Sequence, residues 1–401
     1  MIRSSQFVDA TSVSVTSPQL RVIGLFPELL GTGGIQEAGR QTARALGAIA
    51  GERGWQLQIL SLNDEPGEHH LRSADHPIRF RGFGRRKISF LSYATWQGLS
   101  RARGKLCLVL AGHPNLAPAA SWVRGFSRSV QTVVMTHGVE VWNRLSPLRR
   151  GALMHTDLVL APSQSTVGKL AEIQRIGKKK IRKLAWPVNP DLLRMADARA
   201  SVQLPLGFPT GRIVLTVGRW SSSERYKGLD DLIQATAELR KRFTDLHLVV
   251  VGGGDDLPRL RKLAVDAEIA DAVNFLERVS HGELAACYAN ADVFALPSTG
   301  EGFGLVFLEA MAFAKPVVAA ACGGTIDIVV DGVNGLLIPP HSNPSLVRAI
   351  SRLLEDDSLR TILGQHGAKM VRHKYQFGDF KGELERILSE VVPLHTSSAG
   401  L

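Results

Sequence analysis

The sequence predicts an α/β protein with two domains, each built on a mainly parallel β-sheet that is covered by helices. Two observations carry this prediction. The chain has 401 residues, more than one ordinary core holds, and strand-length apolar segments alternate with helix-length amphipathic segments in both halves. Parallel strands need crossover connections, so this alternation favours parallel sheets. Two such domains would face each other across a cleft.

The first domain is expected over residues 20–188, after a flexible tail at residues 1–19 that is rich in Ser and Thr. Its opening strand, at residues 20–26, is followed by a Gly-rich turn and by a helix that begins near Gly34. Further strands of this half are expected at residues 55–62, 105–110, 131–136 and 157–161. Most of them precede helical stretches, as in a Rossmann-like domain.

The second Rossmann-like domain is expected over residues 189–374. Pro and Gly accumulate without periodicity at residues 186–190 and 204–211, which predicts the linker between the domains. The strands of this domain are expected at residues 212–217, 246–251, 272–275, 293–296, 316–319 and 335–338. Residues 375–401 form a last segment whose apolar side chains line one helical face, and we expect this helix to pack back toward the first domain.

The composition limits the class of protein. The charged fraction of 21% and the apolar fraction of 44% are typical of soluble globular proteins, and no apolar run approaches the roughly 20 residues of a membrane-spanning helix. The cysteines Cys107, Cys287 and Cys322 stand among apolar or small neighbours, which favours reduced, buried thiols over disulfides or a metal site. We therefore expect a cytoplasmic protein.

The net charge of +11 is distributed unevenly. Residues 1–190 contain 26 Lys and Arg against 11 Asp and Glu, which leaves 22 against 26 for residues 191–401. Within the basic half, residues 79–105 interleave Arg and Lys with aromatic side chains and contain no acidic residue, and residues 178–183 form a second basic cluster. Each such charge near an anionic leaflet adds about 1 kcal/mol, so we expect peripheral contact with a membrane. Residues 79–105 could instead form an ordinary helix whose Arg stems cover the core.

Loops after the second-domain strands carry the candidate binding residues, because open parallel sheets bind ligands beyond the carboxyl ends of their strands. Gly218 and Arg219 follow the strand at residues 212–217, and Lys227 stands at the start of the next helix. Arg219 and Lys227 would supply the two positive charges that a diphosphate needs.

Glu309 is the one charge in a helix, residues 305–313, that is otherwise apolar on all sides. Such a helix should be buried, and a buried carboxylate without a partner is costly. Gly302 and Gly304 precede the helix and would let a phosphate approach its free N–H groups. At about 1.5 Å per residue, Glu309 lies roughly 7–8 Å behind that helix start, at the distance of a nucleoside. We therefore expect it to bind ribose hydroxyls.

Glu301 and Glu309 have seven residues between them, and this spacing resembles that of glycosyltransferase family 4, the retaining group 1 glycosyltransferases with the GT-B fold. The resemblance covers nearly the whole chain. Residues 31–34 resemble the family's Gly-rich loop in the first domain, residues 136–138 its His turn and residues 331–336 its late second-domain signature. The implied architecture is two Rossmann-like domains that face each other across a cleft.

The resemblance implies a role for each matching residue. Arg219 and Lys227 would hold the diphosphate and stabilise the departing charge, and Glu301 would face the donor sugar. The implied catalytic residues are Glu301, His137, Arg219 and Lys227, with His137 beside the transferred sugar. The implied donor-binding residues are Gly33, Gly34, Gly218, Arg219, Lys227, Glu301, Gly302, Phe303, Gly304, Leu305 and Glu309.

The implied activity is the transfer of a hexose from a UDP- or GDP-sugar to a sugar hydroxyl of a lipid-linked or polysaccharide-precursor acceptor, as in bacterial polysaccharide biosynthesis. No protein nucleophile is needed where the leaving charge is well stabilised. We expect no metal or other cofactor, because no Asp-x-Asp sequence that could hold a divalent cation stands near these loops and the two cations can replace it.

Other interpretations stay open at this point. The cleft could belong to a nucleotide-sugar epimerase or to a non-catalytic nucleotide-sugar-binding protein. Basic charge can also bind nucleic acid, but we identify no recognition helix or RNA-binding motif, so we expect no nucleic-acid partner. Gly33 and Gly34 could form an ordinary strand-to-helix turn, Arg219 and Lys227 could be surface charges, and His137 could be a structural histidine.

Overall fold

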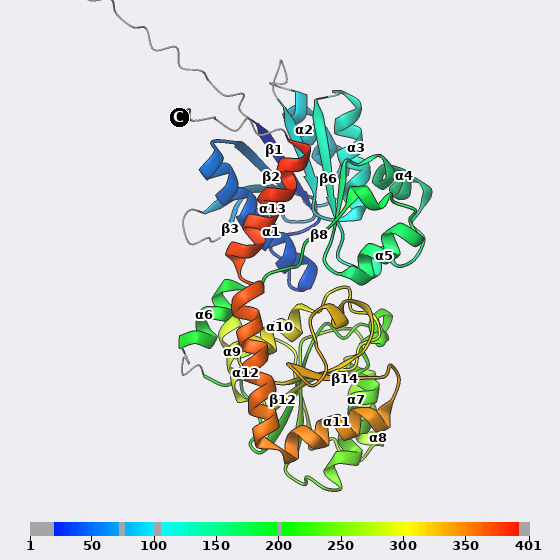
Figure 1. Cartoon of the computed structure of the whole chain (residues 1–401), viewed down its shortest axis with the longest axis vertical. Coiled ribbons are helices and arrows are strands. Elements are labelled where there is room, and N and C mark those ends of the chain that lie inside the picture. The colour runs from blue at the N-terminus through cyan, green and yellow to red at the C-terminus, as the bar shows by residue number, and fades with distance from the viewer. Residues whose placement is uncertain (1–19, 72–76, 100–105, 128, 199–202, 393–401) are drawn as a thin grey trace, which may run out of the picture.

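The computed structural model describes residues 20–71, 77–99, 106–127, 129–198 and 203–392 of the 401-residue chain. These residues form two α/β units, one above the other in Figure 1, each with one β-sheet and with helices packed on it. The expected α/β class with two mainly parallel sheets is confirmed.

The first sheet contains eight strands in the order β3-β4-β2-β1-β5-β6-β7-β8, and all neighbours are parallel except β3 and β4. Its strands are β1 (Arg21–Phe26), β2 (Gln56–Ser61), β3 (Gly67–Leu71), β4 (Ile78–Gly82), β5 (Cys107–Ala111), β6 (Val130–Met135), β7 (Leu158–Ala161) and β8 (Ile181–Lys183). Its helices are α1 (Gly34–Arg53), α2 (Lys87–Leu99), α3 (Ala117–Gly125), α4 (Pro147–His155) and α5 (Gln164–Glu172), with short 3-10 turns η1 (Pro114–Leu116), η2 (Val139–Val141) and η3 (Lys178–Lys180).

Two cores lie on opposite faces of this sheet, because successive side chains of a strand point to opposite sides. Val22 and Phe26 of β1 pack in the same apolar cluster as α1, whereas Ile23 and Leu25 pack in the cluster that contains α2 and α3. One face is therefore covered by α1 and the other by α2 and α3.

The second sheet contains six parallel strands in the order β11-β10-β9-β12-β13-β14. They are β9 (Arg212–Val217), β10 (Leu246–Val251), β11 (Val273–Leu276), β12 (Val293–Leu296), β13 (Val317–Ala320) and β14 (Gly335–Ile338). The helices are α7 (Leu229–Arg240), α8 (Leu257–Asp266), α9 (His281–Asn290), α10 (Leu305–Ala312) and α11 (Asn343–Glu355), with turns η4 (Ser222–Lys227) and η5 (Gly323–Asp327). Each strand expected from the sequence is present here, within one residue at either end.

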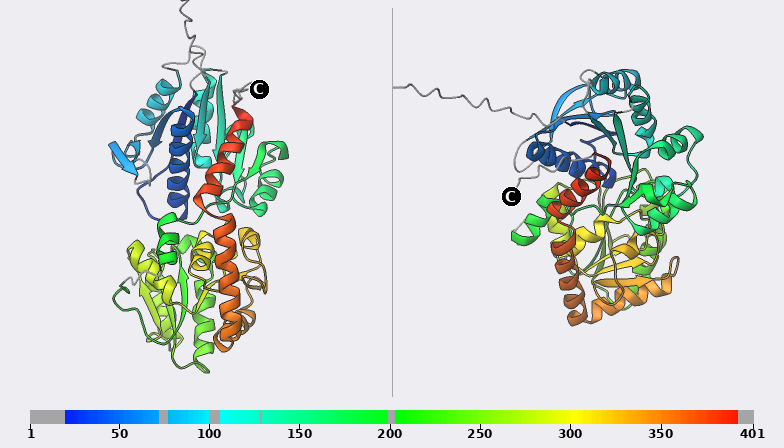
Figure 2. Two further views of the ribbon diagram at one scale, coloured as in Figure 1. Left: turned by 60° about the vertical axis from the view of Figure 1, so that its left-hand side comes forward. Right: turned by 45° about the horizontal axis from the view of Figure 1, so that its top comes forward.

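The chain passes between the two units twice. Helix α6 (Pro190–Ala198) lies between the two Pro- and Gly-rich segments that were expected as one linker. Helix α12 (Asp357–Lys374) runs along the second unit, and α13 (Phe377–Val391) returns to the first (Figure 2). There α13 packs beside α1, with Glu385 accepting from Arg53 at 2.6 Å.

The basic segments of the first half are only partly free to meet a partner. Arg182 pairs with Glu390 of α13 at 2.7 Å, and Lys183 pairs with Asp327 at 3.6 Å. Lys180 donates hydrogen bonds to two backbone carbonyls. The cluster at residues 178–183 therefore contributes to contacts within the molecule, which the sequence pattern did not indicate. Arg101, Arg103 and Lys105 of the other basic segment lie outside the described residues.

Two further expectations concern the burial of the cysteines and the absence of a membrane-spanning helix. Cys107, Cys287 and Cys322 are all free; the first two are buried, whereas Cys322 is partly exposed, contrary to the expectation for that thiol. Among the helices of the described ranges, none combines the length and the apolar character needed to cross a membrane.

Candidate functional site

Helix α10 begins directly behind a glycine turn at the carboxyl end of β12. Gly304 has a φ of 99°, in the left-handed region that favours glycine, and it caps the helix without a side-chain hydrogen bond. Phe307 N donates to Gly304 O at 3.0 Å, whereas Leu305 N and Val306 N have no hydrogen-bond partner among the described residues; together with the helix dipole these two N–H groups favour an anion. Phe307 and Leu308 are fully buried, which fixes the helix in the core of the second unit.

Glu309 has a protein partner in this helix environment. The hydroxyl of Tyr288, a buried residue of α9, donates a 2.8 Å hydrogen bond to Glu309 Oε2. Burial raises the pKa of Glu309 to about 7; the Tyr288 hydrogen bond opposes this rise, and the charge of Glu37 on α1 adds to it. The argument that burial of this carboxylate requires a bound ligand was therefore incomplete. Glu309 Oε1 accepts no hydrogen bond from the described residues and is available to a ligand.

Arg219 and Lys227 lie on the loop after β9, and both pair with Glu224, which the sequence pattern did not single out. Arg219 forms an ion pair with Glu224 Oε1, and Lys227 Nζ lies 3.7 Å from Glu224 Oε2. Lys227 Nζ also lies 3.9 Å from Glu301 Oε1. A single carboxylate thus bridges the two cations that were expected to hold a diphosphate. Its position three residues before Lys227, in the same short turn, was a signal that could have identified it.

Glu301 lies in the loop between β12 and α10. Its backbone carbonyl accepts from Gly324 N at 2.7 Å, which holds the loop against η5. Its Oε1 is buried and has no hydrogen-bond partner in the described structure. Burial and, next in size, the charge of Glu301 raise the pKa of the nearby Tyr226 hydroxyl to about 12. Glu301 therefore presents an acceptor oxygen whose hydrogen-bonding capacity is unused.

Gly33 and Gly34, at the start of α1, belong to the glycine-rich loop of the first unit. Gly33 caps α1 with a φ of 126°, a conformation that other residues rarely adopt. A Cβ on Gly34 would meet no atom within 4 Å, so this position faces open space. The turn thus needs glycine for its backbone at residue 33 and leaves room for a ligand at residue 34.

Two charged side chains hold the loop before these glycines in place. Arg40 Nη1 donates to the carbonyls of Leu29 and Gly31, at 2.9 and 2.7 Å. Asp64, after β2, accepts from Leu29 N at 2.7 Å and Leu30 N at 3.1 Å. Neither was expected as a site residue, because their contacts are to backbone atoms distant in sequence. Their effect is to set the loop geometry before any ligand binds.

His137 follows β6 and belongs to a stack of rings. Its ring lies 5.5 Å from that of His113 and 5.4 Å from that of Trp186, with interplanar angles of 23° and 17°. His137 Nε2 lies 2.8 Å from Gly112 O, and because a carbonyl only accepts, Nε2 carries a proton. His137 Nδ1 is buried and has no partner among the described atoms. His137 is thus both a structural member of the stack and a source of one unused nitrogen.

The His turn and the Glu301 loop meet where the two units touch. A Cβ added to Gly138 would overlap the Cα of Gly302, and a Cβ on Gly302 would overlap the carbonyl oxygen of His137. Ser163 Oγ donates to Gly302 O at 2.7 Å, which joins α5 of the first unit to the donor-side loop of the second. The structure therefore brings His137 and the Glu301–Gly302 segment together.

Other predicted residues have different surroundings. Phe303 is buried, with its ring 6.1 Å from that of Tyr375, so only its backbone can meet a ligand. Leu305 is partly exposed at the first position of α10. Gly218 lies at the end of β9, where a Cβ on Gly252 would overlap its carbonyl. Within the described ranges no hydrogen bond or ion pair connects Gly33 or Gly34 with Arg219 or Lys227.

In the part of the chain that the structure describes, no group of three or more His, Cys, Asp or Glu side chains is placed to hold a metal ion.

The family model for glycosyl transferases group 1 matches residues 205–370, which include Arg219, Lys227, Glu301 and Glu309. A GDP-mannose-dependent alpha-(1-6)-phosphatidylinositol monomannoside mannosyltransferase from Mycobacterium tuberculosis is 33% identical over 284 residues, or 68% of this chain and 72% of that protein. This chain belongs to the group 1 glycosyltransferases. The resemblance inferred from the Glu301–Glu309 spacing is thereby confirmed.

Other group 1 relatives align over smaller shares of their length. A D-inositol 3-phosphate glycosyltransferase from Salinispora arenicola is 42% identical over 45% of this chain and 41% of that protein. An alpha-D-kanosaminyltransferase from Streptomyces kanamyceticus is 28% identical over 64% of this chain and 65% of that protein. The chain thus spans less than two thirds of the length of these two relatives.

Solved structures show the fold of the whole described molecule. A sucrose-phosphate synthase from Thermosynechococcus elongatus superposes with a TM-score of 0.72 at 23% identity, over 92% of this chain and 98% of that one. A trehalose-phosphate synthase from Burkholderia vietnamiensis superposes with a TM-score of 0.70 at 14% identity, over 94% and 100%. The group 1 glycosyltransferase has the expected GT-B fold of two Rossmann-like domains.

Proposed function

We propose that this glycosyltransferase moves a hexose from a UDP- or GDP-sugar to a sugar hydroxyl with retention of the anomeric configuration. The bond from the anomeric carbon to the diphosphate oxygen breaks, and the acceptor oxygen bonds to the same face of that carbon. The acceptor proton passes to the departing diphosphate. Arg219 and Lys227 stabilise the charge that develops on the leaving group, which is usually the largest catalytic contribution in such sites.

The pairing of Arg219 and Lys227 with Glu224 carries this proposal. Two cations that share one carboxylate between loop residues can exchange it for a diphosphate, which brings more negative charge. The uncapped start of α10 adds a second attraction for phosphate. Behind that helix start, Glu309 Oε1 is available to accept from the ribose hydroxyls.

The sugar end of the site is proposed to use two acceptor atoms that have no hydrogen-bond partner among the described residues. His137 Nδ1 and Glu301 Oε1 are buried acceptors, and hydroxyl groups of a hexose would satisfy both. The energetic reason is that a buried polar atom without a hydrogen bond costs about 1–3 kcal/mol, which a bound sugar would recover. In this proposal Glu301 contacts the sugar and Glu309 contacts the ribose.

The acceptor is proposed to be a lipid-linked or polysaccharide-precursor sugar in a bacterium. Support comes from the names of relatives that act on phosphatidylinositol mannosides and on D-inositol 3-phosphate. The basic first domain and the three free cysteines of the chain support work at the cytoplasmic face of a membrane, as a peripheral protein. The reaction is proposed to need no metal, so activity should persist in EDTA.

A panel of uridine, guanosine and adenosine diphosphate sugars tests the donor. We expect one of the first two classes to raise the melting temperature and to be hydrolysed slowly without acceptor. An epimerase would change the sugar, and a non-catalytic binder would leave it intact; either result, or no binding at all, would refute the proposal. With the correct donor, the anomeric proton coupling in the NMR spectrum of the product reports retention or inversion.

Glu301→Ala and Glu309→Ala separate the two ends of the donor. Glu309→Ala should weaken binding of the free nucleoside diphosphate, because the ribose loses its acceptor, by about tenfold for one charge-assisted hydrogen bond. Glu301→Ala should leave that affinity unchanged and lower transfer. Nucleoside diphosphate titration by calorimetry, together with transfer rates, measures both, and equal behaviour of the two variants would contradict the assignment.

A further inference from the structure

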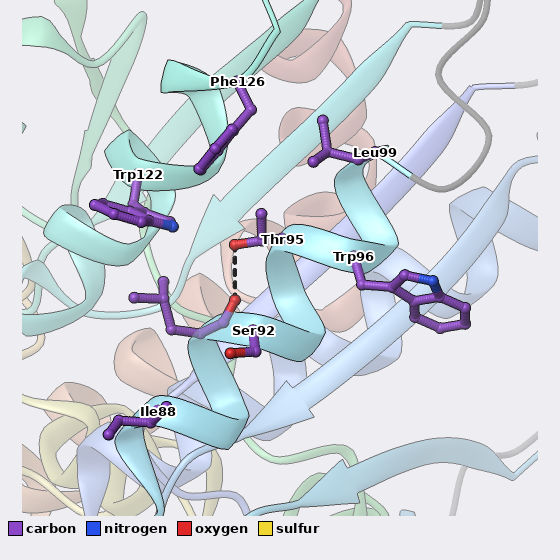
Figure 3. Close-up of a pocket in the computed structure, with 8 residues that line it drawn as sticks. Ile88, Ser92, Thr95, Trp96, Leu99, Trp122 and Phe126 are labelled. Carbon is purple, nitrogen blue, oxygen red and sulfur yellow. Dashed lines mark hydrogen bonds between the residues drawn. The ribbon is translucent and has the colours of Figure 1, made fainter.

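Helices α2 and α3 form an apolar groove on the outer surface of the first domain. It has a volume of about 660 Å³, and its apolar lining consists of Ile88, Leu91, Trp96, Leu99, Trp122 and Phe126 (Figure 3). The groove lies on the face of the sheet opposite α1 and α13, away from the packing between those helices. It is therefore separate from the donor site.

The side chains of this groove are unusually exposed for their type. The exposed fractions are 84% for Ile88, 57% for Trp96, 54% for Trp122 and 52% for Phe126. Single exposed apolar residues are common on protein surfaces, but a contiguous patch of large ones marks an interaction site. These four residues and their neighbours form such a patch along two adjacent helices.

The buried side of α2 already fills the space between this helix and the core, so the other apolar residues of α2 lie outside the core. Phe90, Ala94 and Gly98, spaced by four residues, are buried and already fill the contact with the sheet and α3. Gly98 lets the two helices approach, because a Cβ there would lie 2.7 Å from Val123 Cγ1. The α2 helix thus has one apolar face in the core and a second apolar face in water, and packing the core accounts only for the first.

Three cations stand at the start of α2. Arg85, Arg86 and Lys87 are exposed, and their side chains have no ion pair or hydrogen bond with any described residue. Positive charges in the first turn of a helix oppose its dipole, so this placement is unfavourable unless an anion binds there. By contrast, Arg81 pairs with Glu68 and Arg124 pairs with Asp157. Among the described cations of α2, α3 and the turn before α2, only these three have no ion-pair or hydrogen-bond partner, and they lie at one end of the groove.

That end of the groove faces the cleft edge of the sheet. Strand β4 is parallel to β2, so the turn after β4 lies at the carboxyl edge, where the site loops also lie. Arg85 N donates to Leu62 O at 2.7 Å, and Gly84 N donates to Asp64 O at 2.7 Å. Asp64 in turn holds the glycine-rich loop through Leu29 N. The turn that carries the three cations is therefore connected to that loop through Asp64.

We propose that the α2–α3 groove takes an acyl chain of an anionic membrane lipid whose phosphate is bound by Arg85, Arg86 and Lys87. The proposal rests on the proposed function in one respect, since a lipid held in this way has its headgroup at the cleft. Phosphate at the cleft end and hydrocarbon along α2 match the order of charge and apolar surface in the groove. Charge complementarity thus selects a lipid over a neutral apolar partner.

Sedimentation with vesicles tests the surface as a whole. Wild-type protein should bind vesicles of phosphatidylcholine mixed with phosphatidylglycerol more tightly than vesicles of phosphatidylcholine alone. The double variant R85S/R86S should bind the mixed vesicles about 25-fold more weakly, because each charge contributes a factor of about five at an anionic surface. The double variant K241S/K262S removes two exposed charges from the second domain and should bind as wild type does.

The apolar part of the groove needs its own variant. The double variant W122S/F126S should weaken vesicle binding by about tenfold or more, because each aromatic side chain loses its contact with hydrocarbon. Leu148→Ser, in α4, removes an exposed apolar side chain outside the groove and serves as the matched control. Equal losses in the control and the groove variant would overturn the proposal.

Entry of an acyl chain is distinguished from surface attraction by fluorescence quenching. Mixed vesicles with brominated acyl chains should quench tryptophan emission of the wild type, and the double variant W96F/W122F should lose most of this quenching while it still binds. Binding without quenching would show that the groove stays empty. Competition by glycerol 3-phosphate that abolishes vesicle binding would assign the cations to a soluble phosphate instead.

Two further results would also overturn the proposal without touching the proposed function. Analytical ultracentrifugation should show one mass for the wild type and for W122S/F126S; a dimer that the variant abolishes would mean that a second copy covers the groove. All groove variants should hydrolyse the donor sugar at the wild-type rate. Donor hydrolysis without vesicle binding therefore refutes only the groove, and vesicle binding without donor hydrolysis refutes only the proposed function.

Discussion

The carboxyl group of Glu309 links the chemistry of the site to the stability of the fold. Its pKa in the folded protein is about 7, against an ordinary value of 4.5, and the first cause is burial. Between these two pH values the folded protein holds a proton that the unfolded chain has lost. The free energy of unfolding therefore falls as pH rises from 4.5 to 7, and above about pH 7 the full cost of the buried charge is present.

Glu309→Gln removes this titration and keeps the shape of the side chain. The free energy of unfolding of the variant, relative to wild type, should increase between about pH 4.5 and pH 7.5 by up to about 3 kcal/mol, because a tenfold change in proton affinity is worth roughly 1.4 kcal/mol. Urea unfolding of both proteins at several pH values measures the difference. If the two stability curves run parallel across this range, the pKa of Glu309 in the folded protein is close to its ordinary value.

Substitution of Glu224 should change the affinity for a nucleoside diphosphate in the opposite direction to substitution of most binding-site residues. Its carboxylate occupies Arg219 and Lys227, so it competes with a diphosphate for the same two cations. Glu224→Gln should tighten binding of the free nucleoside diphosphate by about fivefold, the factor for one exposed ion pair worth about 1 kcal/mol. Calorimetric titration measures the affinity.

Glu238→Gln is the control for Glu224→Gln. Glu238 is exposed on α7, and its side chain makes no ion pair with a described residue, so the substitution changes the net charge equally without touching the cations. Affinity should stay at the wild-type value. Weaker binding in Glu224→Gln would show that the carboxylate orients Arg219 and Lys227 for the donor instead of competing with it.

At the scale of elements, the sequence pattern predicted the strands that are apolar along their whole length. Segments such as Leu246–Val251 are buried along nearly their whole length and have no polar alternative. Two strands at one side of the first sheet lack this signal: the edge strand Gly67–Leu71 has only its last residue buried, and its neighbour Ile78–Gly82 alternates apolar residues with Arg. Both were missed, and Ile78–Gly82 was interpreted only as part of a basic segment. Such strands are stabilised by pairing with neighbouring strands, which the pattern of the strand itself does not contain.

Helix α13 bears on catalysis through aromatic contacts. The ring of Phe380 lies 5.7 Å from that of Trp186, which stacks on His137 at 5.4 Å. We expect Phe380→Ala to lower the rate of transfer, because Trp186 and His137 lose the support that holds their rings in place. The variant should also lose about 3–5 kcal/mol of stability, as large core truncations do.

Leu384→Ala separates the two effects of Phe380→Ala. Leu384 is fully buried on the same helix, and its truncation should destabilise the fold by about 2–5 kcal/mol. Transfer rates compared below the melting temperature of both variants should fall only in Phe380→Ala, while donor KM stays unchanged. A similar fall in both variants would mean that α13 affects catalysis through stability alone.

At the scale of the whole molecule, the site depends on contacts that no local sequence pattern contains. Glu301, Gly302 and Gly304 were predicted from one segment, and the structure adds what that segment meets. Gly302 touches Gly138 of the other domain, and Ser163 Oγ donates to Gly302 O. Gln164 N likewise donates to Asp327 Oδ2 at 2.6 Å. A spacing within the chain identifies binding residues, but the pairing of two glycines 164 positions apart follows only from the packing of the domains.

Gly138→Ala tests whether this close approach is needed for transfer. A Cβ at residue 138 would overlap Gly302, and the φ of 130° disfavours any side chain there, so the two domains should be held apart. Nucleoside diphosphate binding should persist, because Arg219, Lys227 and Glu309 all lie in the second domain. Transfer should fall by about a hundredfold or more, since small misplacements of reacting groups have effects of that size. Small-angle scattering should show a larger radius of gyration for the variant than for wild type.

Gly151→Ala, at a position in α4 where a Cβ meets nothing within 4 Å, should match wild type in all three measurements. A Gly138→Ala protein that transfers sugar at the normal rate would mean that the reaction proceeds without the domain contact seen between the His turn and the Glu301 loop.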